Sequence, residues 1–458
     1  MELKKYKLGD IAEIINGATP STDCNDNYDG EIVWITPKDL SDQKSKYIEK
    51  GSRKITQKGY DSCSTQMIPS YNILMSSRAP IGLLAINKVD CCTNQGFKNI
   101  IVNKSICNVD YLYYYLKFHI KEIEALGSGT TFKEVSKVAL QKFEINIPNL
   151  EEQKRIGNLL SALDQKIALN RQINDNLETM AKQLYDYWFV QFDFPNEEGK
   201  PYKSSGGKMV WNEKLKREIP EGWSAKSIFD EMSIQYGFPF STDDFTEEVT
   251  NIPVVRIRDI LDNTISVYSY EETDDKYRLN EADLLIGMDG NFHINYWINN
   301  IAYLNQRSVR LRSKQNSNVS IVQARYDIEP YIKAKEQRAK GSTVGHLSDK
   351  DLKELKVMIC PNREMRDALD SLLYRIIANR KENLSLTKQR DELLPLLMNG
   401  QVSVNYHLYA LLYIDSLILN YTLNARLYEK NIFRHCNSPI RSHFYSRANC
   451  DGGRDSRE

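Results

Sequence analysis

The chain has 458 residues, which excludes a miniprotein and allows two or three domains with full cores. Its 61 Lys and Arg residues balance 61 Asp and Glu residues, so a nucleic-acid surface would have to come from local clustering of charge. Eight cysteines without a CxxC pair or a zinc-like His spacing, no signal peptide and a mean hydropathy of -0.52 indicate a soluble cytoplasmic protein with reduced thiols.

Residues 1–150 predict a mixed α/β unit. Short apolar runs at 31–35 and 71–75 are typical of strands between turn-forming residues, and the unit ends with a helical patch at 111–121 and a strand at 143–147. Polar and basic residues gather in loops that lie beside the expected strands. These loops span 36–40, 76–82, 94–98 and 127–133.

The loops of this first unit contain side chains that suit DNA. Arg and Lys match guanine O6 and N7, Gln and Asn match adenine N6 and N7, and hydroxyls beside glycines suit phosphate. The alternative for each basic residue is a solvated surface charge, and for each hydroxyl a helix cap. The DNA-binding candidates are Lys38, Arg78, Gln95, Lys98, Thr130 and Lys133.

Residues 151–192 predict a long spacer helix. Apolar residues recur every third or fourth position from Ile156 to Trp188, with two asparagines in the middle of the seam and no proline in the run. A helix with one narrow apolar stripe needs a partner helix. The expected pairing residues are Leu163, Ile167, Asn170, Asn174 and Leu177.

Residues 193–222 are rich in Gly, Pro, Ser and charge and predict a connector, and residues 223–360 predict a second α/β unit. The second unit repeats the landmarks of the first at a nearly constant shift. We expect Asp289 to form a turn or accept from cytosine N4, and His293 and His346 to make polar contacts at most. The DNA-binding candidates here are Arg256, Arg258, Asn291, Gln306, Arg307, Ser342 and Thr343.

Residues 361–400 predict a second spacer helix with the same seam and two asparagines at the same two steps. Polar seam residues fix register, so an antiparallel pairing would bring the asparagines of both helices to one level. The expected pairing residues are Leu372, Ile376, Asn379, Asn383 and Leu386. The fold class is therefore α/β (α+β), with two similar globular units on two long antiparallel coiled-coil helices related by a pseudo-two-fold internal repeat.

Residues 401–458 form an atypical C-terminal extension. An apolar, tyrosine-rich stretch at 406–423 precedes an arginine- and serine-rich tail. A packed helix and a continuation of the reading frame past an ancestral end are the two interpretations. Asp415 interrupts the apolar run, so a membrane span is disfavoured.

Several cofactor motifs are absent from the sequence. It has no Gly-rich dinucleotide loop, no GxxxxGK[ST] phosphate loop and no Asn/Asp-Pro-Pro-aromatic tetrapeptide for amino methylation of a base. We assign no catalytic residue and no metal ligand to this chain. Any cofactor chemistry is expected to come from partners.

Four stretches carry a resemblance to a known family. They are the Gly-Ser-Gly-Thr…Ile-Pro-Asn-Leu-Glu-Glu-Gln passage, the connector from Trp188 to Trp223, the loop 287–290 and the Leu-Leu-Pro-Leu-Leu-Met-Asn-Gly ending at 393–400. Across residues 1–404 the chain resembles the specificity subunit of type I DNA restriction-modification enzymes. The resemblance implies two target-recognition domains held apart by antiparallel helices, each reading one half of an asymmetric bipartite site in double-stranded DNA.

The resemblance also implies partners. Two methylation subunits would bind S-adenosylmethionine, restriction subunits would use ATP and Mg, and the specificity subunit itself would hold no cofactor and catalyse nothing. A different interpretation of the same helices is a coiled-coil protein adaptor without sequence-specific DNA binding, which predicts little salt dependence. An enzyme with an unrecognised site is a third, and the absence of a clustered acid, base and nucleophile opposes it.

Overall fold

The computed structural model describes residues 2–43, 45–128, 133–339 and 345–404. Three candidates (Thr130, Ser342 and Thr343) and the extension from residue 405 lie outside these ranges. The chain forms two compact units: unit 1 contains the chain up to Leu169 and the stretch from Asn383, and unit 2 contains Asn170–Glu382. Each unit takes in part of both long helices, whereas the boundaries expected from the sequence assign whole helices to a spacer.

Unit 1 is built on a five-stranded sheet of order β2-β9-β6-β7-β4, a three-stranded sheet of order β5-β3-β8 and the antiparallel pair β1-β10. Most strands pair antiparallel, and β3-β8 and β4-β7 are parallel. The strands are β1 Lys4–Lys7, β2 Ala12–Asn16, β3 Tyr28–Ile35, β4 Tyr47–Ile48, β5 Arg53–Ile55, β6 Ile73–Met75, β7 Leu84–Asn87, β8 Cys92–Thr93, β9 Lys98–Val102 and β10 Glu144–Ile147.

Short helices connect the strands of unit 1, and polar residues cap them. Asn108 accepts a hydrogen bond from Tyr111 N at 2.9 Å at the start of α4, and Ser136 accepts from Ala139 N at 3.1 Å at the start of α6. The helices are α1 Leu8–Ile11, η1 Asn25–Asn27, α2 Pro37–Ser41, α3 Gln57–Asp61, α4 Val109–Phe118, α5 Ile120–Ala125 and α6 Lys137–Gln141.

Unit 2 repeats this plan with sheets β14-β21-β18-β19 and β15-β17-β16-β20 and the pair β13-β22. The parallel pair β16-β20 corresponds to β3-β8, and Ser348 caps α10 as Ser136 caps α6. The strands are β13 Ser224–Ser227, β14 Met232–Tyr236, β15 Phe245–Thr246, β16 Ile252–Val255, β17 Val267–Ser269, β18 Leu284–Gly287, β19 Ile294–Tyr296, β20 Tyr303–Leu304, β21 Ser308–Ser313 and β22 Lys356–Ile359.

The helices of unit 2 include one that was not anticipated from the sequence, α9, which has Pro330 inside it. The expected connector also contains structure, because β11 Met209–Asn212 and β12 Arg217–Pro220 pair as an antiparallel hairpin. The helices are α8 Ile228–Glu231, η3 Thr242–Asp244, η4 Ile257–Asp259, η5 Asp275–Tyr277, α9 Ile321–Ala339 and α10 Asp349–Glu354.

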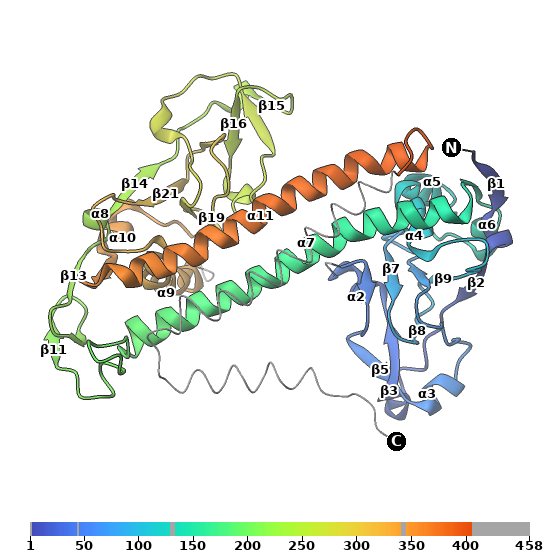
Figure 1. Ribbon diagram of the computed structural model, residues 1–458, viewed down its shortest axis with the longest axis horizontal. Helices are drawn as coiled ribbons and strands as arrows, with labels where there is room; N and C mark the ends of the chain where they lie inside the picture. Colours follow the sequence, from blue (N-terminus) through green and yellow to red (C-terminus); the bar gives the residue numbers. More distant parts are fainter. Residues whose placement is uncertain (1, 44, 129–132, 340–344, 405–458) are drawn as a thin grey trace. The chain divides into compact units, whose positions relative to one another are not determined.

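The two longest helices are α7, Leu150–Tyr185, and α11, Arg363–Met398, drawn in green and orange in Figure 1. A π-helical turn, η2 Asp186–Val190, extends α7. Within unit 1, Arg390 Nη1 lies 2.7 Å from Asp164 Oδ1 and Asn383 donates to the carbonyl of Ile167. Contacts move toward the start of α11 as α7 advances, so the helices are antiparallel.

The seam asparagines meet the partner helix in both units. In unit 2, Asn379 Nδ2 donates to Asn174 Oδ1 at 2.9 Å, and Asn174 Nδ2 donates to the carbonyl of Ile376 at 3.2 Å. In unit 1, Asn383 Nδ2 donates to the carbonyl of Ile167 at 3.3 Å. In both helices an asparagine bonds the carbonyl of an isoleucine on the other helix, which repeats one contact along the seam. Asn170 donates to Glu382 at 2.7 Å.

Apolar seam residues are buried beside these asparagines. Leu163, Ile167 and Leu386 form a small cluster in unit 1. Leu177, Leu372 and Ile376 belong to the large core of unit 2, which also takes in the aromatic end of α7 at Phe189. Two α/β units with similar sheets, together with two long antiparallel helices, confirm the fold class expected from the sequence.

Candidate nucleic-acid interface

Three of the loops selected in unit 1, together with the residues that follow position 132, come together beyond the ends of its strands. Ser77 N donates to the carbonyl of Gly96 at 2.7 Å, and Val135 N donates to the carbonyl of Ser77 at 2.9 Å. Asn94 N donates to the carbonyl of Ile35 at 3.1 Å, which joins the 94–98 loop to the strand that leads into α2. Backbone hydrogen bonds of this kind hold each loop to the next. Segments far apart in sequence therefore form one surface.

Four predicted side chains of unit 1 are exposed on these loops: Lys38, Arg78, Gln95 and Lys133. Thr36 and Asp39 form a capping box that, with Pro37 at the first turn, begins the short helix carrying Lys38. Gln95 accepts a hydrogen bond from the Thr19 hydroxyl. These loops thus present cationic and amide groups to solvent on a unit that belongs to a chain of zero net charge.

Lys98 does not belong with the exposed candidates. Its side chain is 7% exposed, and its Nζ lies 2.9 Å from Glu134 Oε1. Arg78 Nε lies 2.9 Å from the other oxygen of the same carboxylate, and the Arg78 side chain is 49% exposed. We therefore correct the expectation for Lys98. A buried ammonium cannot reach a base edge, so Lys98 binds Glu134 from the interior of the unit and does not contact DNA.

Glu134 links both cations. Partial burial would raise the pKa of this carboxyl, but the hydrogen bonds and charges of Lys98 and Arg78 outweigh burial and hold the pKa below its usual range. The carboxylate is therefore ionised near neutral pH. It keeps the Arg78 guanidinium in a defined place.

The loops of unit 2 converge in the same way. Met288 N donates to the carbonyl of Arg307 at 2.8 Å, and Leu347 N donates to the carbonyl of Met288 at 2.8 Å. Gly290 N donates to Gly345 O at 3.0 Å, and Asn305 N donates to Val255 O at 3.0 Å. The bonds of Met288, Leu347 and Asn305 match those of Ser77, Val135 and Asn94 in unit 1.

Asp289 is the centre of a second charged cluster. Its Oδ2 lies 2.5 Å from Arg307 Nη1, and its Oδ1 lies 2.5 Å from His346 Nδ1. Burial would raise the pKa of Asp289, but these two partners hold it below its usual range. The turn-forming role expected of Asp289 is therefore joined by an ionic one, and His346 makes the polar contact expected of it.

The remaining candidates of unit 2 divide by exposure. Arg258, Asn291 and Gln306 are exposed. Arg256 is partly buried: its Nη2 donates to Ser266, and its Nε lies 3.5 Å from Asp259 Oδ2. The role of Arg256 as a DNA contact stays a prediction, because its side chain keeps 21% of its surface exposed.

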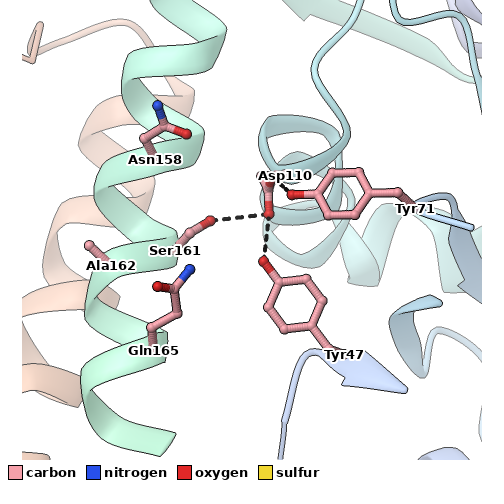
Figure 2. A pocket seen from close by; sticks show the side chains of 7 residues that line it. All are labelled: Tyr47, Tyr71, Asp110, Asn158, Ser161, Ala162 and Gln165. Carbon is pink, nitrogen blue, oxygen red and sulfur yellow. Dashed lines mark hydrogen bonds between the residues drawn. The ribbon is translucent and has the colours of Figure 1, made fainter. Parts of the chain in front are cut away.

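Unit 1 also has a polar cleft of about 180 Å³ beside α7, lined by Tyr47, Tyr71, Asp110, Asn158, Ser161, Ala162 and Gln165. Figure 2 shows the hydroxyls of Tyr71, Tyr47 and Ser161 directed at the Asp110 carboxylate. Lys46 Nζ completes the network at 2.6 Å from Asp110 Oδ1, and its side chain is 3% exposed. Because these groups bind one another, we interpret the cleft as the junction between α4 and α7.

Sequence reasoning missed two acidic residues, Glu134 and Asp110. Glu134 stands beside polar and basic residues, where nothing local marks it, whereas Asp110 interrupts an apolar, tyrosine-rich run at 109–116. In the structure, isolated bridges join Arg78 to Glu134 and Asp289 to His346 at matching places. Aligning the two units sets Arg78 opposite Asp289 and Glu134 opposite His346, which shows charged or polar groups at both positions in each unit but does not show that they pair.

Metal and membrane chemistry receive no support from the described residues. Among them, no group of three or more His, Cys, Asp or Glu side chains is placed to hold a metal ion. No helix within the described ranges is both long and apolar enough to cross a membrane.

Comparison with known proteins identifies a family and relatives for this chain. The family model described as Type I restriction modification DNA specificity domain matches residues 1–179 and 220–389. The MjaIX specificity subunit of a type I restriction enzyme from Methanocaldococcus jannaschii is 31% identical over 416 residues, covering 87% of this chain and 93% of that protein. The EcoR124I/EcoR124II specificity subunit from Escherichia coli is 29% identical over 208 residues, covering 43% of this chain and 50% of that protein.

A solved structure has the same fold. The S subunit of a type I restriction-modification system from M. genitalium superposes with a TM-score of 0.58 at 17% identity, covering 87% of this chain and 96% of that one. The family match favours the DNA-reading interpretation over the protein adaptor that the sequence alone left open. With both halves of the repeat matched, the chain belongs to the type I restriction-modification DNA specificity family.

Proposed function

We propose that this chain is the sequence-specific DNA-recognition subunit of a type I restriction-modification complex, with each unit reading one half of a bipartite site. One observation carries the proposal: in each unit, loops converge and present exposed basic and amide side chains. Arg, Lys, Gln and Asn are the side chains that read base edges in the major groove. Because the loops of the two units differ in sequence, the two half-sites differ and the target is asymmetric.

The subunit acts through partners. Two methylation subunits would dock on it and supply S-adenosylmethionine, and restriction subunits would supply ATP and Mg chemistry. The chain itself would hold no cofactor and act in the cytoplasm as a non-catalytic reader and scaffold. The long helices, with their polar outer faces, are the natural surface for those partners.

The test is to co-express the full chain with its methylation subunit and to map methylated adenines across the host DNA. We expect a split, asymmetric motif. Replacing residues 1–150 with the corresponding segment of a relative should then change one half of the motif and leave the other. Methylation without any motif, or a swap that alters both halves together, would contradict the proposal.

A further inference from the structure

We propose that Arg78 and Arg307 are the guanine-reading residues of the two units, and that Glu134 and Asp289 are positioning residues that aim them. This inference rests on the proposed DNA recognition. It adds a residue for each half-site and assigns a role to acidic groups on a surface that must approach a polyanion.

In unit 1 the geometry leaves one edge of the guanidinium for a ligand. Arg78 donates a hydrogen bond to Glu134 through Nε. Within the described ranges, its two terminal nitrogens make no hydrogen bond with the protein. The two terminal nitrogens are the ones that can pair bidentately with guanine O6 and N7. An arginine with a fixed Nε loses less side-chain entropy when it binds a base.

Glu134 places a negative charge on a surface that must approach phosphate, and two cations, Arg78 and Lys98, bind that charge. Lys98 Nζ lies 2.9 Å from Glu134 Oε1 and 3.4 Å from Ser77 Oγ. A buried lysine, an anchored carboxylate and an exposed arginine thus form a chain from the interior to solvent. Each member restricts the orientation of the next.

Unit 2 builds a related arrangement from different positions. Arg307 donates to Asp289 through Nη1, so Nε and Nη2 form the edge that is left for a base, and the second basic group, His346, is exposed where Lys98 is buried. Asp289 takes the place of Arg78 after β18, and His346 takes the place of Glu134, as their matching bridges show. The arginine now comes from the turn before β21, where unit 1 has Gly96. Arg307 is 66% exposed and Asp289 is 17% exposed, so the carboxylate is again the inner member. Two assemblies with separate residue origins share one pattern: an exposed arginine, a carboxylate and a second basic group.

The backbone of Arg307 supports a functional role for this residue. Its φ is 62°, in the left-handed region that arginine rarely adopts. Such conformations need the surrounding structure to hold them, and they are enriched at binding and catalytic sites. The strained turn places Arg307 beside Asp289 in unit 2. In unit 1 the arginine that binds the carboxylate, Arg78, comes from the loop after β6.

The experiment compares methylation maps for the full complex carrying Arg78→Lys, Glu134→Gln, Arg307→Lys or Asp289→Asn. Lysine keeps the charge but cannot bind guanine bidentately. We expect Arg78→Lys and Glu134→Gln each to relax one G·C pair in the unit 1 half-site, with discrimination at that pair falling roughly 5- to 150-fold. Arg307→Lys and Asp289→Asn should do the same in the other half-site.

The experiment has two controls. The half-site of the untouched unit reports folding within the same molecule. Glu49→Gln, which breaks the exposed Glu49–Lys88 pair of 2.8 Å outside the converging loops, is the matched control and should leave the motif unchanged. Uniformly weaker methylation without relaxed bases would mean that the arginines bind phosphate alone. A sharp motif with Glu134→Gln would overturn the positioning role. A wild-type complex that methylates without a motif would overturn the proposed function itself.

Discussion

Unit 1 and unit 2 each attach α7 to a buried or partly buried carboxylate on an equivalent helix, but they surround that carboxylate with different chemistry. On α4 of unit 1, Asp110 accepts from Ser161 of α7 and faces the Lys46 ammonium. On α9 of unit 2, Asp327 accepts from Tyr185 of α7 at 2.8 Å, and its other donors are the amide of Gln323 and the backbone of Met358. One carboxylate has a cation and the other has neutral donors.

The pKa values follow the partners. Burial would raise the pKa of Asp110, but the charge of Lys46 and the hydrogen bonds it receives bring the pKa below its usual range. For Asp327, burial outweighs the same kinds of hydrogen bonds and raises the pKa to about 6. The comparison teaches that a cation beside a buried carboxyl can offset the rise in pKa that burial causes, whereas neutral donors beside the more deeply buried Asp327 do not.

The largest expected change in stability comes from removing the Lys46 cation beside Asp110 in unit 1. Lys46→Met keeps an aliphatic stem but leaves Asp110 as an unpaired buried charge, which typically costs about 3–5 kcal/mol. We expect unit 1 to unfold more easily by that amount, with α4 and the first half of α7 losing protection in hydrogen-exchange mass spectrometry. Unit 2 should keep its protection.

The control for that change comes from unit 2, where the second residue of α9 is the buried Val322 and the second residue of α4 is Asp110. Adding Asp110→Val to Lys46→Met removes both charges and should recover more than half of the lost stability. A double variant no more stable than Lys46→Met alone would show that the two charges are not coupled.

A smaller effect is expected from Asp327→Asn in unit 2. The folded pKa of about 6 lies above the unfolded value of 3.8, so the folded state binds the proton more tightly between these values. The unfolding free energy contributed by Asp327 should therefore fall as pH rises from about 4 to about 6 and stay level above that. The variant lacks this loss and should gain about 1–3 kcal/mol on the wild type over that range.

Urea unfolding at pH 4.5, 5.5 and 7 measures this difference. Tryptophan fluorescence reports mainly on unit 2, because Trp188, Trp211, Trp223 and Trp297 lie in it and Trp34 lies in unit 1. A stability difference between variant and wild type that is constant with pH would contradict a raised pKa. The Asp283→Asn variant would not serve as a control. Arg312 binds the Asp283 carboxylate through two nitrogens, so this substitution would also disrupt an ion pair.

The elements that sequence predicted best were those with a sustained period. The heptad seam located α7 and α11, because a narrow apolar stripe sustained over many turns is typical of helices that pair along their length. α9 was not predicted, and Pro330 inside it is a local signal against a helix, yet Ile328 and Ile332 are fully buried and their packing maintains the helix. Tertiary contacts that lie far away in sequence outweighed the local signal there.

For the candidate site, the loops were predictable and the roles within them were not. Gly, Pro and polar residues beside strands mark a loop from sequence alone. Whether a lysine there is exposed depends on contacts with residues distant in the chain: Lys98 is buried against Glu134, whereas Lys133, beside the same glutamate in sequence, is exposed. Residue type suggests a chemistry, and three-dimensional contacts decide which residues can use it.

The smallest expected effect concerns the turn before β21, where unit 2 has Arg307 in the left-handed region and unit 1 has Gly96. Arg307→Gly and Arg307→Ala both remove the Asp289 ion pair, but only glycine also relieves the backbone, so the glycine variant should be more stable than the alanine variant by about 1 kcal/mol. Urea unfolding of the two variants measures this difference, and equal stability would contradict strain at φ 62°. Both variants should also lose discrimination in the unit 2 half-site, so strain relief would accompany a loss of reading, as expected where a function holds the backbone in an unfavourable conformation.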